Sequence, residues 1–106
     1  MITDERVEKA LEFIRDNAGA IGLAVAKCKH LEQKRKTVKG VEFHKAEGTM
    51  AEREQAAYAS DAFKEVSQEI EHAWYDAETL RTRLRAAELT IEIWRTQSSN
   101  QRSGVV

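Results

Sequence analysis

Proline is absent from this sequence, cysteine occurs once, and glycine occurs five times in 106 residues. Because proline and glycine mark the turns between elements, their scarcity disfavours a fold built from many short elements. The lone Cys28 excludes an internal disulfide. No apolar run is as long as a membrane span, and no segment has the three-part form of a signal peptide. We therefore expect a small cytoplasmic protein with one domain at most and no membrane segment.

The sequence also lacks an excess of charge of one sign. Charged residues make up 33% of the chain, but the formal net charge is only −1. Such a balance predicts no bulk attraction to nucleic acid. A chain this short buries little surface, which disfavours an enclosed catalytic pocket and favours stabilisation by a partner or by self-association. The three histidines are too far apart to form a helical pair of metal ligands. We expect neither enzymatic activity nor a cofactor.

A heptad pattern from residue 63 to residue 94 is the strongest feature that is present. Its apolar members recur in alternating steps of three and four residues, which keeps a narrow seam on one side of a helix. They are Phe63, Val66, Ile70, Ala73, Ala77, Leu80, Leu84, Ala87, Ile91 and Trp94. Such a seam is buried by coiling against another helix, so this segment predicts a coiled coil.

An earlier seam has the same kind of spacing. Its predicted members are Val7, Leu11, Ile14, Ala18, Ile21, Val25 and Cys28. The two seams are expected to face each other. After Cys28, Leu31 and Val38 continue the apolar pattern in a shifted phase, which predicts a stutter in the heptad.

The connection between the seams carries capping signals. Thr49 and Glu52 are spaced as a capping box, and Ser60 with Asp61 supplies a second helix start. These signals predict helices over residues 4–46, 50–58 and 61–96, which together form one hairpin domain over residues 1–96, followed by a frayed or disordered tail over 97–106. The expected fold is all-α: a long antiparallel helical hairpin, a coiled coil with a short helix in its connection, that assembles into a helical-bundle oligomer.

Two glycines interrupt the small and apolar segment over residues 18–26. Each glycine in a helix interior costs about 1 kcal/mol relative to alanine, so Gly19 and Gly22 need an explanation. One interpretation is that they let bulky residues of the second helix approach closely. The other is a hinge, or a second helix docking at this place.

Charge is distributed in blocks along the chain. Residues 27–45 contain seven basic and two acidic side chains, whereas residues 47–78 contain nine acidic and two basic ones. In an antiparallel hairpin the two blocks lie opposite each other and can set the register of the helices. The other interpretation is a nucleic-acid or partner-binding patch, whose residues would be Lys34, Arg35, Lys36, Lys39 and Arg95.

A second stripe follows the later helix beside its main seam. Its members are Tyr75, Thr79, Thr82, Ala86, Leu89 and Ile93, again in steps of four and three. Two seams on one helix imply two neighbours, and an apolar stripe left exposed marks an interface. We expect Tyr75, Ala86, Leu89 and Ile93 to form an oligomer interface or a docking surface for another protein.

Several short motifs resemble those of small, poorly characterised phage and prophage proteins. They are residues 7–11, 31–32 with the basic run that follows, 52–54, 57–60 and 91–100. Where those relatives have a proline just before the long helix, this chain has Asp61 or Ala62. Such proteins tend to be encoded among recombination and replication genes. The resemblance implies a phage setting in the cytoplasm of a bacterial host and no catalytic residues.

Three functional hypotheses follow. The first is an accessory protein of phage DNA recombination or replication that binds DNA or a recombinase through the basic residues named above. The second is an inhibitor of a host defence complex, similar to anti-CRISPR proteins, with Glu65, Glu69 and Glu71 imitating phosphates. The third is a structural coiled-coil spacer. None of the three requires a cofactor.

Overall fold

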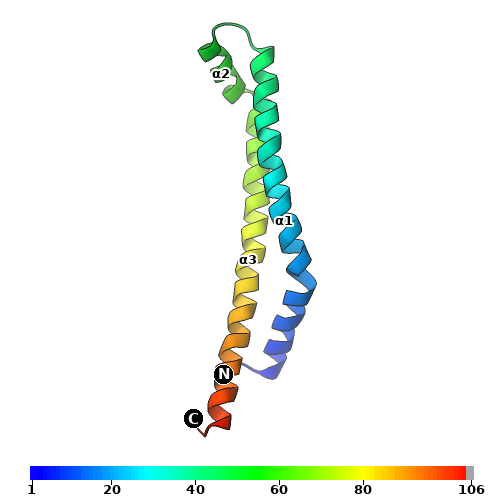
Figure 1. Cartoon of the computed structure of the whole chain (residues 1–106), viewed down its shortest axis with the longest axis vertical. Coiled ribbons are helices and arrows are strands. Elements are labelled where there is room, and N and C mark those ends of the chain that lie inside the picture. Colours follow the sequence, from blue (N-terminus) through cyan, green and yellow to red (C-terminus); the bar gives the residue numbers. More distant parts are fainter. Residues whose placement is uncertain (105–106) are drawn as a thin grey trace. The chain divides into compact units, whose positions relative to one another are not determined.

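The protein is built from α-helices in the computed structural model, which describes residues 1–104. The helices are α1 (Asp4–Lys45), α2 (Met50–Ala59) and α3 (Asp61–Arg102) (Figure 1). Within residues 1–104 there is no strand. The predicted all-α fold and the short helix in the connection are confirmed.

A hydroxyl side chain caps the N-terminus of each of the three helices α1, α2 and α3. The Thr3 hydroxyl accepts a hydrogen bond from the Arg6 backbone N–H at 3.2 Å, and the Thr49 hydroxyl accepts one from the Glu52 N–H at 3.2 Å. The Ser60 hydroxyl accepts from the Phe63 N–H at 3.2 Å and donates to the Ala57 carbonyl at 2.7 Å. These bonds satisfy amide groups that a helix start leaves unpaired, as the capping signals predicted.

The end of α3 differs from the prediction. The helix runs to Arg102, so residues 97–102, expected to be frayed, are helical, whereas residues 105–106 of the predicted tail lie outside the described residues. The Gln97 side-chain oxygen accepts a hydrogen bond from the Ile2 N–H at 3.1 Å. Loss of the heptad does not end a helix when no proline or glycine follows, and the first glycine here is Gly104, with φ +77°.

The contacts within the chain divide it into two compact units, and both long helices contribute to each. Unit 2 comprises Leu23–Ala77. Its core contains Cys28 and Leu31 from α1 and Ile70, Ala73 and Ala77 from α3. The Trp74 indole N–H donates to the Glu32 carboxylate at 2.9 Å, and Lys34 pairs with Glu69 at 3.6 Å.

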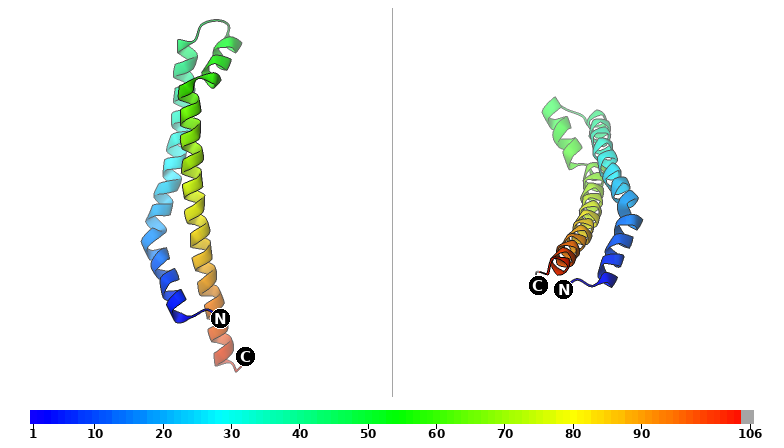
Figure 2. Two further views of the ribbon diagram at one scale, coloured as in Figure 1. Left: turned by 180° about the vertical axis from the view of Figure 1, so that it is seen from behind. Right: turned by 60° about the horizontal axis from the view of Figure 1, so that its bottom comes forward.

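The pairings in unit 2 identify the direction of the helices. Going from Glu32 to Lys34 along α1, the partner moves back from Trp74 to Glu69 along α3, so the two segments are antiparallel. Figure 2 shows this part of α1, coloured cyan, beside the first part of α3. The short helix α2 lies next to the last turns of α1, where the Arg53 guanidinium donates to the Phe43 carbonyl at 3.2 Å.

Unit 1 comprises Met1–Gly22 together with the segment that begins at Glu78, described here to residue 104. Val7, Ala10 and Ala87 are its buried apolar side chains. The Trp94 indole N–H donates to the Asp4 carboxylate at 3.0 Å. Together with the Ile2–Gln97 bond, this pairing places the start of the chain beside the last turns of α3.

Every predicted member of the α3 seam is buried or half-buried. Val66, Ile70, Ala73, Ala77 and Ala87 are buried. The remaining members are half-buried: Phe63, Leu80, Leu84, Ile91 and Trp94. The heptad pattern therefore identified the packed side of this helix correctly.

The α1 seam was predicted wrongly at two of its seven positions, Leu11 and Ala18, whereas its other members are buried or half-buried. Leu11 is 52% exposed and Ala18 is exposed. The side of α1 that is covered instead follows steps of three and four through Val7, Ala10, Ile14, Asn17, Ile21, Ala24, Cys28, Leu31, Arg35, Val38 and Glu42. This series keeps one phase throughout, so the stutter predicted after Cys28 is absent within α1.

The correct α1 seam is hard to see in the sequence because it contains polar and small residues. Ala10 is buried although Leu11 next to it is more apolar. Arg35 and Glu42 are half-buried at seam positions. Long charged side chains can lay their methylene groups on apolar surface while the charged end reaches water, which allows them to occupy such positions.

Gly19 and Gly22 do not mark a close approach of the second helix. A Cβ atom built at either position would meet nothing within 4 Å. The interpretation that these glycines let bulky residues of α3 come near is therefore wrong. The alternative, a hinge or a docking place for another helix, stays a prediction.

Candidate protein-binding surface

The basic side chains predicted as a binding patch are partly engaged within unit 2. The Lys39 ammonium group donates to the Glu54 carboxylate at 3.3 Å and to the Tyr58 hydroxyl at 2.6 Å, and it lies 4.3 Å from the centre of the Tyr58 ring. The hydrogen bond to Tyr58 is the largest influence on the pKa of Lys39; desolvation opposes it, and the bond to Glu54 adds to it, so that the pKa is raised above its ordinary 10.5. Lys39 therefore holds α2 against α1.

The remaining basic residues do not gather on one surface. Successive residues of an α-helix are rotated by about 100°, so Lys34, Arg35 and Lys36 point in three directions. Lys34 pairs with Glu69, Arg35 is half-buried on the seam, and Lys36 is exposed. Arg95 is exposed on α3 in unit 1. Unit 2 thus does not assemble the four α1 residues into a continuous cationic patch.

The opposed charge blocks account for part of the basic run. Lys34–Glu69 and Lys39–Glu54 each join the basic segment of α1 to the acidic segment that follows it. The interpretation that these blocks face each other is confirmed at these two pairs. An exposed pair such as Lys34–Glu69 contributes less than about 1 kcal/mol, so its main effect is on register.

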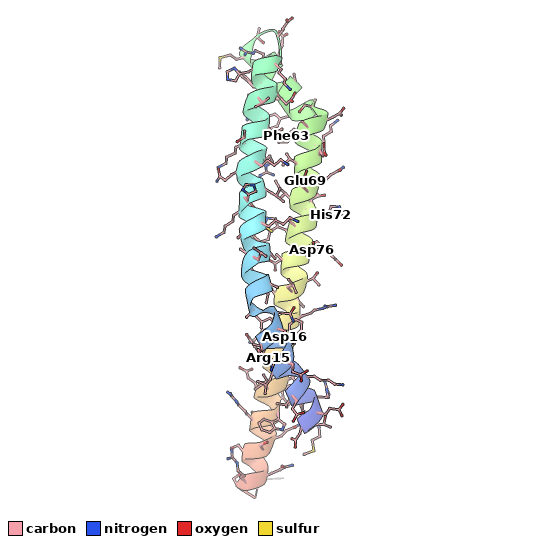
Figure 3. All side chains as sticks on the ribbon, turned by 90° about the vertical axis from the view of Figure 1, so that its right-hand side faces the viewer. Arg15, Asp16, Phe63, Glu69, His72 and Asp76 are labelled. Atoms are coloured by element: carbon pink, nitrogen blue, oxygen red, sulfur yellow. The ribbon has the colours of Figure 1, made fainter. Side chains whose placement is uncertain are left out.

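Two of the three predicted acidic residues line a shallow groove in unit 2. Glu65 and Glu69 border it together with Asp76. The groove has a volume of about 310 Å³, and its other lining residues are Lys27, Leu31, Gln68, His72 and Ala73. Glu69, His72 and Asp76 are labelled on α3 in Figure 3. Glu71 is exposed but is not among the residues that line the groove.

The second stripe of α3 is exposed in unit 1. Leu89 is 40% exposed, Ile93 is 48% exposed, and Ala86 is exposed. Each follows a seam residue by two positions, which places it about 200° around the helix, on the side opposite the seam. Apolar side chains on that side have no role in the core of unit 1. The fourth predicted interface residue, Tyr75, is 72% exposed and belongs to unit 2.

Charged side chains flank the exposed stripe of unit 1. Arg85 and Glu92 lie along one border, and Arg83 lies along the other, all of them exposed. Arg85 makes a long ion pair of 3.6 Å with Glu88 of its own helix. An apolar strip with charged borders is the arrangement that coiled-coil interfaces use.

Two exposed leucines on α1 were not expected from the sequence. Leu23 is 75% exposed, and Leu11, predicted to be on the seam, is 52% exposed. The signal that could have identified them is the unbroken series through Ala10, Asn17 and Ala24, which leaves both leucines outside the seam.

Cys28 and the carboxylates do not form a metal-binding cluster in the part of the chain that is described. Cys28 is fully buried in the core of unit 2. Within residues 1–104, no three His, Cys, Asp or Glu side chains lie close enough to hold a metal ion. No helix among these residues is both long and apolar enough to cross a membrane.

Comparisons with protein-family models, with curated proteins and with solved structures found no match to this chain.

Proposed function

We propose that this chain is a non-enzymatic phage accessory protein that works by protein–protein binding in DNA recombination or replication, as an oligomer in the cytoplasm of the host. The observation that carries the binding part is the exposed stripe of Ala86, Leu89 and Ile93 on the side of α3 opposite its seam. The phage setting is supported by the resemblance of the short motifs described above.

A protein partner such as a recombinase is favoured over DNA. A DNA interface needs several cationic side chains aimed at the phosphates of one duplex or strand. Here Lys34 and Lys39 make ion pairs with Glu69 and Glu54. Arg35 is half-buried, and Lys36 lies beside Lys39 in a groove that Glu54 also lines. The charge that remains available on α1 is too dispersed for a tight, salt-sensitive DNA site.

The test is a titration of labelled single- and double-stranded DNA with the purified chain at several salt concentrations, followed by fluorescence anisotropy. We expect that the chain alone does not bind DNA in a salt-sensitive manner. When a phage recombinase is already bound to the DNA, we expect addition of the chain to change the fluorescence anisotropy. Replacing Lys34, Arg35 and Lys36 with alanine should leave both results unchanged. Tight binding by the chain alone that disappears in this triple variant would contradict the proposal and favour direct DNA binding.

A second candidate function rests on the groove bordered by Glu65, Glu69 and Asp76. Carboxylates spaced along one helix could imitate phosphates and occupy a cationic surface of a host defence complex. If so, replacing Glu65 and Glu69 with glutamine and Asp76 with asparagine should abolish inhibition of that complex. Inhibition that persists in this variant would eliminate phosphate mimicry as the mechanism.

A further inference from the structure

We propose that the exposed stripe of α3 is covered by a second copy of this chain in antiparallel orientation, with a two-fold axis between residues 87 and 88. This inference deepens the proposed function, because it identifies the first binding partner as the chain itself and gives the register of the pair. It rests only on the part of α3 that belongs to unit 1.

The first argument is the spacing of the stripe. Thr82, Ala86, Leu89 and Ile93 follow steps of four, three and four residues, which is the spacing of a coiled-coil seam. In a symmetric pair, residue i contacts residue j of the other copy and j contacts i. An axis between residues 87 and 88 places Leu89 opposite Ala86 of the second copy, and Ile93 opposite Thr82.

The second argument is the complementarity of size in this register. Each large side chain meets a smaller one, since Leu89 faces Ala86 and Ile93 faces Thr82. Alternation of large and small residues across a seam lets two helices interdigitate. Leu89 and Ile93, which water now contacts over 40% and 48% of their surface, would be covered.

The third argument is charge complementarity along the border. In the same register, Arg85 lies beside Glu92 of the second copy, and the two-fold axis creates this pair twice. Shifting the axis to residue 84 would instead bring Arg85 against Arg85 and Glu78 against Glu92. Like charges facing each other across a coiled-coil border oppose association, so the charges select the first register.

Arg85 is available for such a pair. Its present partner Glu88 is 3.6 Å away, and the two side chains are 62% and 46% exposed. An ion pair that exposed is weak and exchanges readily. Glu92 is exposed on the same border one heptad further along α3.

Charge reversal tests this register. The association constant is measured by sedimentation equilibrium for the wild-type chain and for the variants Arg85→Glu and Glu92→Arg. Each single reversal replaces two attractive pairs with two repulsive ones, so we expect self-association to weaken about tenfold in either variant. Arg15→Glu is the matched control for Arg85→Glu, because Arg15 is exposed on α1 and its reversal changes the net charge by the same amount.

Mixing the two variants is the decisive measurement. A dimer made of one Arg85→Glu copy and one Glu92→Arg copy has opposite charges in both of the 85–92 pairs, so the equimolar mixture should associate about as strongly as the wild type. Weakening by one reversal without rescue in the mixture would overturn the register. A wild-type chain that stays monomeric at every concentration would overturn self-association. In that case the recombinase titration described above still tests the proposed function separately.

Discussion

Small side chains dominate the core of unit 2. Cys28 and Ala77 are completely buried, and Ala73 is nearly so. They allow α1 and α3 to pack closely, but each of them removes little apolar surface from water. The larger buried residues of this unit, among them Leu31 and Val66, therefore contribute a large share of its stability.

Leu31→Ala should lower the free energy of unfolding by about 2 to 3 kcal/mol, because it deletes a buried side chain from a thin core. Leu23→Ala is the matched control on the same helix, since Leu23 is 75% exposed, and it should change stability by less than about 0.5 kcal/mol. Denaturant unfolding followed by circular dichroism measures both values. Equal effects of the two substitutions would show that the packed side of α1 is assigned wrongly.

Lys39 anchors α2 through Glu54 and Tyr58. Its raised pKa has a simple consequence for stability, because the protonated form is the one that makes these contacts. The contribution is fully present below the ordinary pKa of 10.5 and is lost as the pH rises through the higher value in the folded protein. Around neutral pH it should be constant.

Lys39→Gln should therefore increase hydrogen exchange of the α2 amides about two- to fivefold near neutral pH, as expected for loss of one exposed ion pair. Lys36→Gln is the control, since Lys36 is exposed three residues earlier on the same helix. Unchanged exchange in Lys39→Gln would mean that the cap at Thr49 and the Arg53 contact are enough to hold α2.

At the scale of elements, the sequence predicted α3 better than α1. On α3 the apolar heptad and the buried side agree at every position from Phe63 to Trp94. On α1, Leu11 lies beside the small seam residue Ala10, so a search for the most apolar series finds the wrong position there. Which side of α1 is buried depends on how α3 packs against it, and the periodicity of α1 alone does not reveal that packing.

The candidate surface was predictable only in part. The stripe through Ala86, Leu89 and Ile93 followed from spacing on one helix, and its members in unit 1 are exposed as expected for an interface. The sequence did not reveal which residues of the predicted basic patch are paired, because the partners of Lys34 and Lys39 lie 35 and 15 residues away along the chain. Such pairings depend on tertiary structure rather than on local pattern.

The helical glycines lead to a prediction about elements. Because a Cβ at Gly19 or Gly22 meets nothing within 4 Å, replacing either with alanine should raise the free energy of unfolding by about 0.5 to 1 kcal/mol. Gly48 is the contrasting control, since its φ of +114° strains any other residue. Gly48→Ala should lower stability by about 1 to 2 kcal/mol. Destabilisation by Gly19→Ala and Gly22→Ala would indicate a contact or a hinge at these positions.

At the scale of the whole molecule, the balance of charge and the exposure of apolar stripes both favour association between protein chains. The net charge of −1 gives no long-range attraction to nucleic acid. Small chains leave much of their surface in contact with water, so a second copy that covers Leu89 and Ile93 would also stabilise the fold. The melting temperature should then rise with protein concentration, because association favours the folded state.

The most direct test of this account is the mass of the chain in solution after the stripe is made polar. Sedimentation equilibrium should show that Leu89→Ser with Ile93→Ser shifts the wild-type oligomer to monomer, while helix content stays the same. The matched control, Leu11→Ser with Leu23→Ser, alters two exposed leucines on α1 and should leave the mass unchanged. An unaltered mass in the α3 variant would contradict the account, because it would show that this stripe is not an interface.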